Sequence, residues 1–510
     1  MKFSIVKRFM AIVIAIVLVM GLSACGNETV TSEYWVWEDE DVQVDGDINS
    51  EQQDDSGSSS ATKKPSASNN NSSANNSSSK NNSSVNNSSS KKPTANKDTD
   101  SWDEYRVKVG TVGANGKDYS NYNPYEGIEK YKGTTVKFAT WMDPSKDIYS
   151  NVSKDFYEKY GIKLEYVYCS QDAYAQEVLS LIAANNAPDI IFENDFFPSS
   201  LQLVQPITVS GIDLNAPNWD QNTIKALSYN GKCYFVNAIN SPDVMSSAIT
   251  VFNKDLLESN GIKTPEEYYK EGKWTISNLK KICQQVCALG SEYKGAYFDS
   301  TYSPVVFGGS LVSFDGKKFT NTYLSKKFTS AMKFKAEMTQ LNYAYTDSAD
   351  FTSGKGAIMI TDNSPLKVTG YTRNMDPDSL GYTYLPKADD NSTQVFASMT
   401  RGYGISKGSK NPVAAGYAIC YMTDGNNFNL KDVFVNKDAA AFNYNLVSNV
   451  NKGKMVVCYE GGVAKVTGTW AGYWRDVPAN PDQVEVFMQS QNNKVQNAID
   501  KSNELLGKTK

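Results

Sequence analysis

The sequence predicts an α/β protein made of two α/β lobes with a cleft between them. Residues 134–195 alternate strand and helix patterns, and a second alternation of this kind begins near residue 248. The span from about residue 105 to 510 is also too long for one ordinary domain. Strands that alternate with helices are typical of parallel, doubly wound sheets, whose ligands bind outside the carboxyl ends of the strands.

The first alternation contains three apolar runs that suit strands buried on both faces, with two helical patterns between them. The first helix ends at Gly161, a residue that closes a helix without a Cβ penalty. The second begins near Asp172, which is a good N-cap, and stops before Pro188. The predicted order is strand 136–141, helix 145–160, strand 162–167, helix 172–187 and strand 190–192.

Two of the predicted strand ends carry an aromatic ring and short polar side chains. Trp141 and Asp143 follow the first strand, and Glu193, Asn194 and Asp195 follow the third. Sugar hydroxyls both donate and accept hydrogen bonds, and the apolar faces of sugar rings lie well on Trp or Tyr. These residues therefore suit a neutral ligand rich in hydroxyl groups.

A second lobe is indicated by a further series of strand and helix patterns. Residues 249–252 form a predicted strand, residues 253–260 form a short helix closed by Gly261, and Ser277 caps a longer helix. Residues 314–317, which read Phe-Asp-Gly-Lys, predict a tight hairpin.

The amino-terminal region predicts export and a lipid anchor. Residues 1–24 combine basic residues with an apolar run of the length expected for a secretory signal. The four residues that end at Cys25 resemble the lipobox of bacterial lipoproteins, which implies cleavage before Cys25 and acylation there. Residues 25–101 are rich in Ser and Asn and predict a disordered tether, because they cannot bury enough apolar surface to fold. The folded region is then residues 102–510.

Charge and composition argue against several classes of function. The net charge of −5 becomes −8 when the three basic residues of the signal are removed, which argues against nucleic-acid binding. The chain has no histidine, which excludes Ser-His-Asp, Cys-His and His-metal chemistry. The six cysteines after Cys25 lack zinc-site spacing, and their disulfide state is left open. We predict no cofactor and no metal site.

Five motifs, in order, resemble the extracellular solute-binding proteins of ABC importers, the carbohydrate-type family that includes maltose-binding protein. Each motif is loose by itself, but together they cover most of residues 134–425. They are Lys137-Phe138-Ala139-Thr140-Trp141, Ala187-Pro188-Asp189-Ile190-Ile191, Phe252 to Leu257 with Gly272-Lys273-Trp274-Thr275, Phe351 to Met359, and Tyr403 to Pro412.

The resemblance implies a bilobed, type II periplasmic-binding-protein-like fold with a multi-strand hinge. We expect the lobes to comprise about 134–240 with 401–428, and about 247–393 with 429–510. The family's ligand positions imply contacts near the strand ends, and the facing wall of the cleft is expected in a Gly-rich stretch near the carboxyl end. The predicted ligand contacts are Trp141, Asp143, Glu193, Asn194, Asp195, Asn240, Asp362, Asn363, Trp470, Tyr473 and Trp474.

The resemblance also implies partners and a location. A neutral carbohydrate is the expected ligand, because anionic ligands usually require arginine and few arginines follow the signal. ABC permease subunits are the expected membrane partners of a monomer that is anchored by lipid to the outer face of the cytoplasmic membrane.

Three alternatives remain open at this point. The patterns Ser277-x-x-Lys280, Thr361-Asp362-Asn363 and Lys465 to Gly468 fall in the order of a penicillin-interacting serine enzyme. Glu193 with a second acid would be compatible with a glycosidase. A surface adhesin or sensor would bind glycan without transport.

Overall fold

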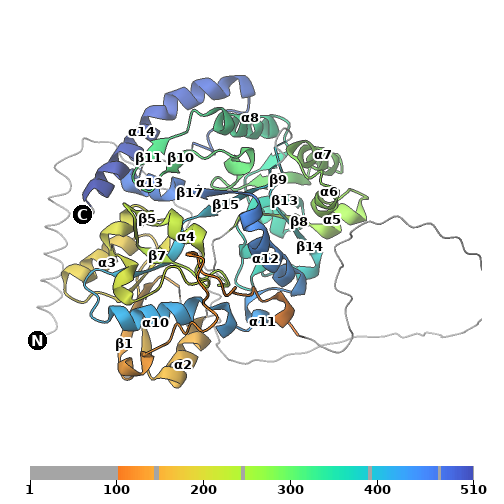
Figure 1. Cartoon of the computed structure of the whole chain (residues 1–510). Coiled ribbons are helices and arrows are strands. Elements are labelled where there is room, and N and C mark those ends of the chain that lie inside the picture. The colour runs from red at the N-terminus through yellow and green to blue at the C-terminus, as the bar shows by residue number, and fades with distance from the viewer. Residues whose placement is uncertain (1–100, 143–148, 243–246, 389–392, 469–472, 509–510) are drawn as a thin grey trace, which may run out of the picture. The chain divides into compact units, whose positions relative to one another are not determined.

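The structure, a computed structural model, describes residues 101–142, 149–242, 247–388, 393–468 and 473–508 (Figure 1). The predicted signal, Cys25, nearly all of the predicted tether, Asp143 and Trp470 lie outside these residues. Within the described ranges, no helix combines the length and the apolar character needed to cross a bilayer.

The first sheet contains the three strands predicted between residues 134 and 195. Its order is β2-β1-β3-β16-β4, and β7 pairs with β16. Strand β1 is parallel to β2 and β3, which confirms the predicted parallel arrangement, whereas β16 runs antiparallel to β3. The strands are β1 (Thr135–Thr140), β2 (Lys163–Tyr168), β3 (Ile190–Asn194), β4 (Val204–Gln205), β7 (Phe235–Val236) and β16 (Arg401–Ser406).

Helices α2 (Tyr149–Tyr160) and α3 (Tyr174–Ala183) connect these parallel strands. Gly161, at φ 68°, follows α2 as predicted. The predicted N-cap of the next helix is wrong, because Ala173 occupies the N-cap of α3 and no side chain caps it. Other elements on this side are η3 (Ser199–Gln202), η4 (Ile207–Ser210), α4 (Gln221–Ala226), β5 (Ser228–Tyr229) and β6 (Lys232–Cys233).

The second sheet has the order β12-β9-β13-β8-β14. Strand β9 is parallel to β12 and β13, while β8 is antiparallel to β13 and β14. The strands are β8 (Ile249–Asn253), β9 (Lys294–Phe298), β12 (Ala344–Tyr345), β13 (Gly356–Thr361) and β14 (Leu380–Thr383). The accompanying helices are α5 (Lys254–Ser259), α6 (Pro265–Lys270), α7 (Ile276–Cys287), η5 (Ser303–Phe307), α8 (Lys326–Gln340), α9 (Ala349–Thr352), η6 (Ser364–Leu366) and η7 (Pro377–Ser379).

Two local predictions on this side have different outcomes. The predicted hairpin is confirmed, since β10 (Val312–Phe314) pairs antiparallel with β11 (Phe319–Asn321). The predicted Ser277 cap is wrong, because the Thr275 side chain accepts the hydrogen bond from the backbone N–H of Asn278. Ser277 therefore lies inside α7.

The chain passes between the two sheets at three places. It first leaves β7 for β8, and it later returns through β15 (Val395–Met399) to β16. These two passages touch, because the Ala248 N–H donates to the Ala397 carbonyl at 2.7 Å. The third passage, residues 424–429, follows helix α10 (Pro412–Thr423), and the chain later forms β17 (Lys454–Cys458), which pairs in parallel with β15.

The last helices cover both sheets. Helix α10 contacts α2 and β1, whereas α14 lies beside α8 and β11, near the top of Figure 1. These elements are α10 (Pro412–Thr423), η8 (Gly425–Asn427), α11 (Leu430–Val433), α12 (Lys437–Asn449), η9 (Val450–Lys452), α13 (Glu460–Thr467), η10 (Pro481–Gln483) and α14 (Val484–Lys508). Within residues 101–134, two short helices precede β1, namely η1 (Asp103–Tyr105) and η2 (Ile128–Tyr131).

The core contains two apolar clusters, and each takes buried residues from both sheets. All six cysteines of the described region are free thiols, and five of them are buried. Burial raises the pKa of Cys169 and Cys233 to about 11 and that of Cys420 to about 12. These side chains therefore act as apolar filling, as expected of buried thiols.

Candidate ligand site at the strand ends

Polar and aromatic side chains collect where strands of both sheets end. Trp141 follows β1, Asp195 follows β3, Asp299 follows β9 and Asp362 follows β13. The ends of β9 and β13 are adjacent, since the Asp299 N–H donates to the Ile360 carbonyl at 3.0 Å. Glu460 begins α13, directly after β17 and Tyr459.

Trp141 is held in an aromatic cluster at the end of β1. Its ring meets Tyr174 edge-on at 5.0 Å between centroids and is tilted against Phe192 at 5.1 Å. Phe196 adds a third edge contact at 5.7 Å. Trp141 remains half-buried, so its ring is fixed by its neighbours and part of it stays accessible.

Glu193 is fully buried, and its carboxylate has partners within the protein. Its Oε1 accepts hydrogen bonds from the N–H groups of Phe196 at 2.8 Å and Phe197 at 2.9 Å, and from the Thr400 hydroxyl at 2.9 Å, whereas its Oε2 has no hydrogen-bond partner within the described residues. Burial raises the pKa of this carboxyl, and the hydrogen bonds oppose that rise. These contacts make Glu193 a support for the loop after β3, and its role in contacting ligand stays a prediction.

Asp195 joins the end of β3 to helix α13. Its backbone is left-handed, with φ 60°, and its Oδ1 accepts a hydrogen bond from the Gly462 N–H at 3.2 Å. The Lys465 ammonium donates to the Asp195 carbonyl at 2.8 Å. Burial raises the pKa of the Asp195 carboxyl to about 6, although Lys465 and the Gly462 N–H oppose the rise. Asn194 is half-buried and lies opposite Arg401 in the ladder with β16.

Asp299 and Asp362 occupy the ends of β9 and β13. Asp299 Oδ1 accepts hydrogen bonds from the N–H groups of Thr301 at 2.8 Å and Tyr302 at 3.3 Å, and Asp362 accepts from the Ser364 N–H at 3.0 Å. Burial raises the pKa of Asp299 to about 6, and the negative charge of Asp362 adds to the rise. Both carboxylates are half-buried.

Two buried polar groups beside these carboxylates lack an internal partner. The hydroxyl of Tyr302 and Oε2 of Glu460 have no hydrogen-bond partner within the described residues. Glu460 Oε1 accepts from the Leu311 N–H at 3.0 Å. Burial raises the pKa of Glu460 to about 7, and the nearby Asp195 charge contributes. Buried groups without partners are costly, so both atoms are candidates to bind water or ligand.

The two predicted aromatic residues near the carboxyl end have different environments. The Tyr473 hydroxyl donates to the Ser300 carbonyl at 3.0 Å, which places Tyr473 beside the loop after β9. Trp474 is buried, and its indole N–H donates to the Phe298 carbonyl at 3.3 Å. Trp474 therefore packs under the site, while Tyr473 stands at its side.

Two predicted asparagines lie in other surroundings. The Asn240 amide donates to Asp424 at 2.8 Å, where the first and third passages between the sheets meet. Asn363 is buried and lines a small cavity of about 20 Å³ together with Asp220, Leu446 and Val450. The ligand roles of these two asparagines stay predictions.

The site is acidic, since Asp195, Asp299, Asp362 and Glu460 surround it; Lys465 contacts Asp195, and the Arg401 guanidinium lies 5.5 Å from the Phe192 ring at the end of β3. No group of three or more His, Cys, Asp and Glu side chains among the described residues is arranged to hold a metal ion. Sequence reasoning missed Asp299, Tyr302 and Glu460. Asp299 could have been found, because it follows a strand as Asp195 does.

The family model of the bacterial extracellular solute-binding proteins matches residues 151–431, more than half of the chain. The chain belongs to this family, whose members bind solutes outside the cell. No curated protein sequence matches the chain.

Solved structures share the fold at low sequence identity. The GacH receptor of Streptomyces glaucescens, described with acarbose, has a TM-score of 0.54 and 17% identity, over 71% of this chain and 98% of that one. The sugar-binding protein MalE of Xanthomonas citri has a TM-score of 0.51 and 14% identity, over 74% and 98%. The ABC substrate-binding protein Lmo0181 of Listeria monocytogenes, described with cycloalternan, has a TM-score of 0.50 and 17% identity, over 73% and 99%. The chain thus has the bilobed fold of these proteins, with one sheet in each lobe.

Proposed function

We propose that this protein captures a sugar or oligosaccharide outside the cell and delivers it to the permease of an ABC importer. One observation carries the proposal: in a member of the solute-binding family, Trp141, Asp195, Asp299 and Asp362 stand at strand ends of two separate sheets. Ligands of open α/β sheets bind outside such ends. The three similar structures are described as sugar-binding, as an ABC substrate-binding protein, or with an acarbose or cycloalternan ligand.

The chemistry of these residues suits hydroxyl groups. Carboxylates accept hydrogen bonds from sugar hydroxyls, and the unpartnered Tyr302 hydroxyl and Glu460 oxygen gain partners when a ligand enters. The exposed part of Trp141 offers an apolar face to a sugar ring. An anionic ligand would meet four carboxylates, which outnumber the cations Lys465 and Arg401 at these strand ends, so we expect such ligands to be rejected.

Capture would depend on movement of the two lobes. Because each lobe contributes part of the site, the full set of contacts forms when the lobes are closed, and ligand shifts the population toward that state. A micromolar dissociation constant corresponds to about −8 kcal/mol, which a few such contacts supply. The permease would recognise the closed form.

The location and anchoring complete the proposal. Cys25 would carry the lipid, residues 26–101 would serve as the tether, and a single copy of the folded region would work at the outer face of the cytoplasmic membrane. Family membership agrees with the extracellular location. We infer a binding protein and no enzyme, since Thr275 caps α7 and the Lys280 ammonium pairs with Glu337.

A thermal-shift screen of residues 26–510 tests the proposal. We expect at least one neutral oligosaccharide to raise the melting temperature and to be recovered intact, whereas sialylated or sulfated sugars have no effect. A rise with anions alone would contradict the ligand class. Release of reducing ends would indicate a hydrolase, and a covalent adduct with a β-lactam reporter would indicate a serine enzyme. Absence of neighbouring permease genes would favour an adhesin or sensor.

A further inference from the structure

The segment that precedes the first strand, residues 101–131, is bound along much of its length. Near its start, η1 contacts helix α12. In its middle, the Tyr119 hydroxyl donates to Asp213 at 2.7 Å, and the Ala114 N–H donates to the Asn215 carbonyl at 2.8 Å. Near its end, η2 contacts α10, and Tyr125 stacks on Tyr160 of α2 at 5.3 Å.

These contacts fall on both sides of the third passage between the sheets. Helix α12 belongs with the second sheet, because Phe442 packs on Tyr384 beyond β14 at 5.4 Å. Helix α10 belongs with the first sheet, because Tyr421 packs on Phe156 of α2 at 5.0 Å. A segment of about thirty residues therefore touches both lobes, and it lies outside the matched family region, which starts at residue 151.

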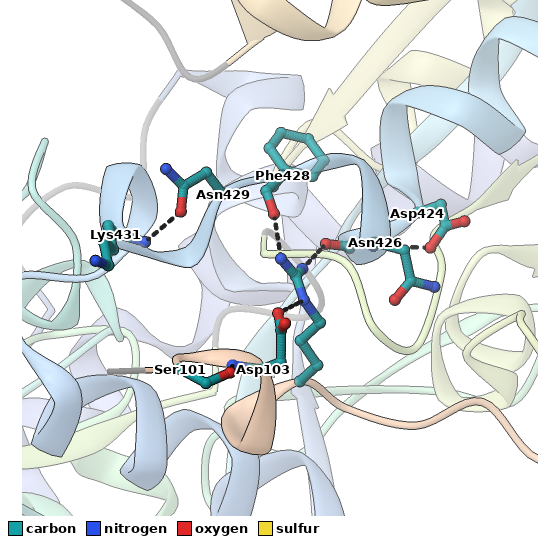
Figure 2. Close-up of polar contacts among 9 residues, drawn as sticks. Ser101, Asp103, Asp424, Asn426, Phe428, Asn429 and Lys431 are labelled. Atoms are coloured by element: carbon teal, nitrogen blue, oxygen red, sulfur yellow. Dashed lines mark hydrogen bonds and ion pairs between the residues drawn. The ribbon is translucent and has the colours of Figure 1, made fainter. Parts of the chain in front are cut away.

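Arg106 binds the third passage directly. Its Nη1 donates to the Gly425 carbonyl at 2.8 Å and its Nη2 donates to the Phe428 carbonyl at 2.9 Å. Its Nε donates to Asp103 at 2.7 Å, which orients the guanidinium. Figure 2 shows Asp103 facing the passage that contains Phe428. All three guanidinium nitrogens thus donate hydrogen bonds. One bond goes to Asp103 within the segment, and two go to backbone carbonyls of the third passage.

The first passage meets the third at the same place. The Asn240 amide donates to Asp424 at 2.8 Å, and Asp424 also accepts from the Asn426 N–H at 3.0 Å. Gly425 lies so close to Asn240 that a Cβ there would come 2.0 Å from its carbonyl oxygen. Rotation of one lobe against the other must change the backbone dihedral angles of these residues, because hinge motion is absorbed by a few linking positions.

We propose that residues 101–131 are a brace across the hinge, with Arg106 as its attachment to the third passage. When the lobes move apart, the brace must release Arg106 from Gly425 and Phe428 or lose its contacts with one lobe. The brace therefore favours the conformation described and slows the dihedral changes of residues 424–429. This inference assumes the lobe movement of the proposed function, but it requires no particular ligand.

Hydrogen exchange of the full chain without sugar tests the brace. The Asn426, Asn427 and Phe428 N–H groups are hydrogen-bonded within the third passage, so their exchange reports its opening. We expect Arg106→Ala to accelerate their exchange about tenfold, and Arg106→Lys, which keeps the charge but loses the planar fork, to accelerate it by a smaller factor. The exposed Arg373→Lys variant is the matched control and should leave the exchange unchanged.

Exchange of the β1 amides separates a local effect from general destabilisation. The brace is supported if exchange rises at residues 426–428 and stays constant in β1. It is overturned if the passage exchanges within twofold of the unmodified chain, or if both regions accelerate equally in Arg106→Ala and in Arg106→Lys. Since no sugar is present, failure of the sugar-binding screen would leave this result intact, and an unchanged passage would leave sugar binding intact.

Discussion

The carboxyl ends of β3 and β9 carry similar acidic residues but use them differently. At β3, Glu193 is fully buried, and its carboxylate holds two backbone N–H groups and the Thr400 hydroxyl. At β9, Asp299 is half-buried and binds N–H groups of the loop that follows it. One carboxylate supports the fold, while the other caps a loop beside the candidate site.

The different roles of Glu193 and Asp299 follow from where each residue lies relative to its strand. Glu193 still belongs to β3 and lies opposite Gly402 of β16, so its side chain is directed into a packed face. Asp299 is the first residue beyond β9 and remains partly accessible. A carboxylate just past a strand end is therefore a better ligand candidate than one inside the hydrogen-bonded ladder of the strand.

The largest effect expected from this comparison is the loss of stability in Glu193→Ala. Removing the carboxylate leaves two buried N–H groups and one hydroxyl without an acceptor, which costs about 3 kcal/mol or more. Urea denaturation measures the free energy of unfolding. Glu193→Gln, which keeps an acceptor, should lose less. A loss below about 1 kcal/mol in Glu193→Ala would show that the two strand ends do not differ as described.

Asp299→Asn should have the opposite profile, weakening ligand binding and sparing the fold. The amide oxygen can still accept from the Thr301 N–H, but the charge offered to a sugar hydroxyl is lost. We expect the dissociation constant of the sugar found by screening to rise about tenfold to a hundredfold, and the unfolding free energy to change by less than about 1 kcal/mol. Calorimetric titration measures the first quantity. Equal affinity in the two proteins would remove Asp299 from the site.

The pH dependence of stability compares three acids with raised pKa values, namely Asp195 after β3, Asp299 after β9 and Glu460 after β17. The pKa of Glu460 is raised to about 7 and those of Asp195 and Asp299 to about 6, so between pH 4.5 and 7 the folded protein holds protons that the unfolded chain has released. Stability should therefore fall as pH rises through this window, by at most about 1.4 kcal/mol per pH unit for each proton, and level off above it.

Melting temperatures from pH 4.5 to 8 measure this slope. Glu460→Gln should make it shallower, because the amide does not titrate, and Glu258→Gln at an exposed position of α5 serves as the control. If Glu460→Gln leaves the slope of melting temperature against pH unchanged, the protons held by the folded protein belong to other groups.

The smallest effect is expected for Lys465→Met. The Lys465 side chain is 46% exposed, so its interactions with Asp195 are weak, and we expect a loss of less than about 1 kcal/mol. Because the Lys465 ammonium lowers the pKa of Asp195, its removal should move the lower part of the pH profile toward higher pH. The same melting series detects this. A loss as large as that of Glu193→Ala would show that the end of β3 depends on this contact.

The sequence predicted the first sheet well, because continuous apolar runs of this length, separated by helical patterns, are compatible with few arrangements other than a parallel sheet. It predicted helix starts less well. Asp172 and Ser277 are good capping residues, but neighbouring positions compete for the cap, and the helices have their N-caps at Ala173 and Thr275, one and two residues away.

The sequence pointed to part of the candidate site, whose ligand contacts stay predictions. Trp141, Asp195 and Asp362 follow strands that are recognisably apolar, whereas the strand before Asp299 begins with Lys294 and Gly295 and gives a weaker signal. The different role of Glu193 depends on its partner Thr400, about two hundred residues away, and no local pattern encodes such a contact. The contacts of residues 101–131 with both lobes could not be predicted from the sequence for the same reason.

The free thiols described above have a practical consequence for measuring lobe movement. Five of the six described cysteines are buried, and Cys287 is half-buried against the Asn342 carbonyl. Since the reactive form of cysteine is the thiolate, raised pKa values and burial leave these residues slow toward maleimides at neutral pH. Fluorophores could then be attached to two engineered surface cysteines without first removing the native ones, so that opening and closing can be followed by energy transfer in an otherwise unaltered core.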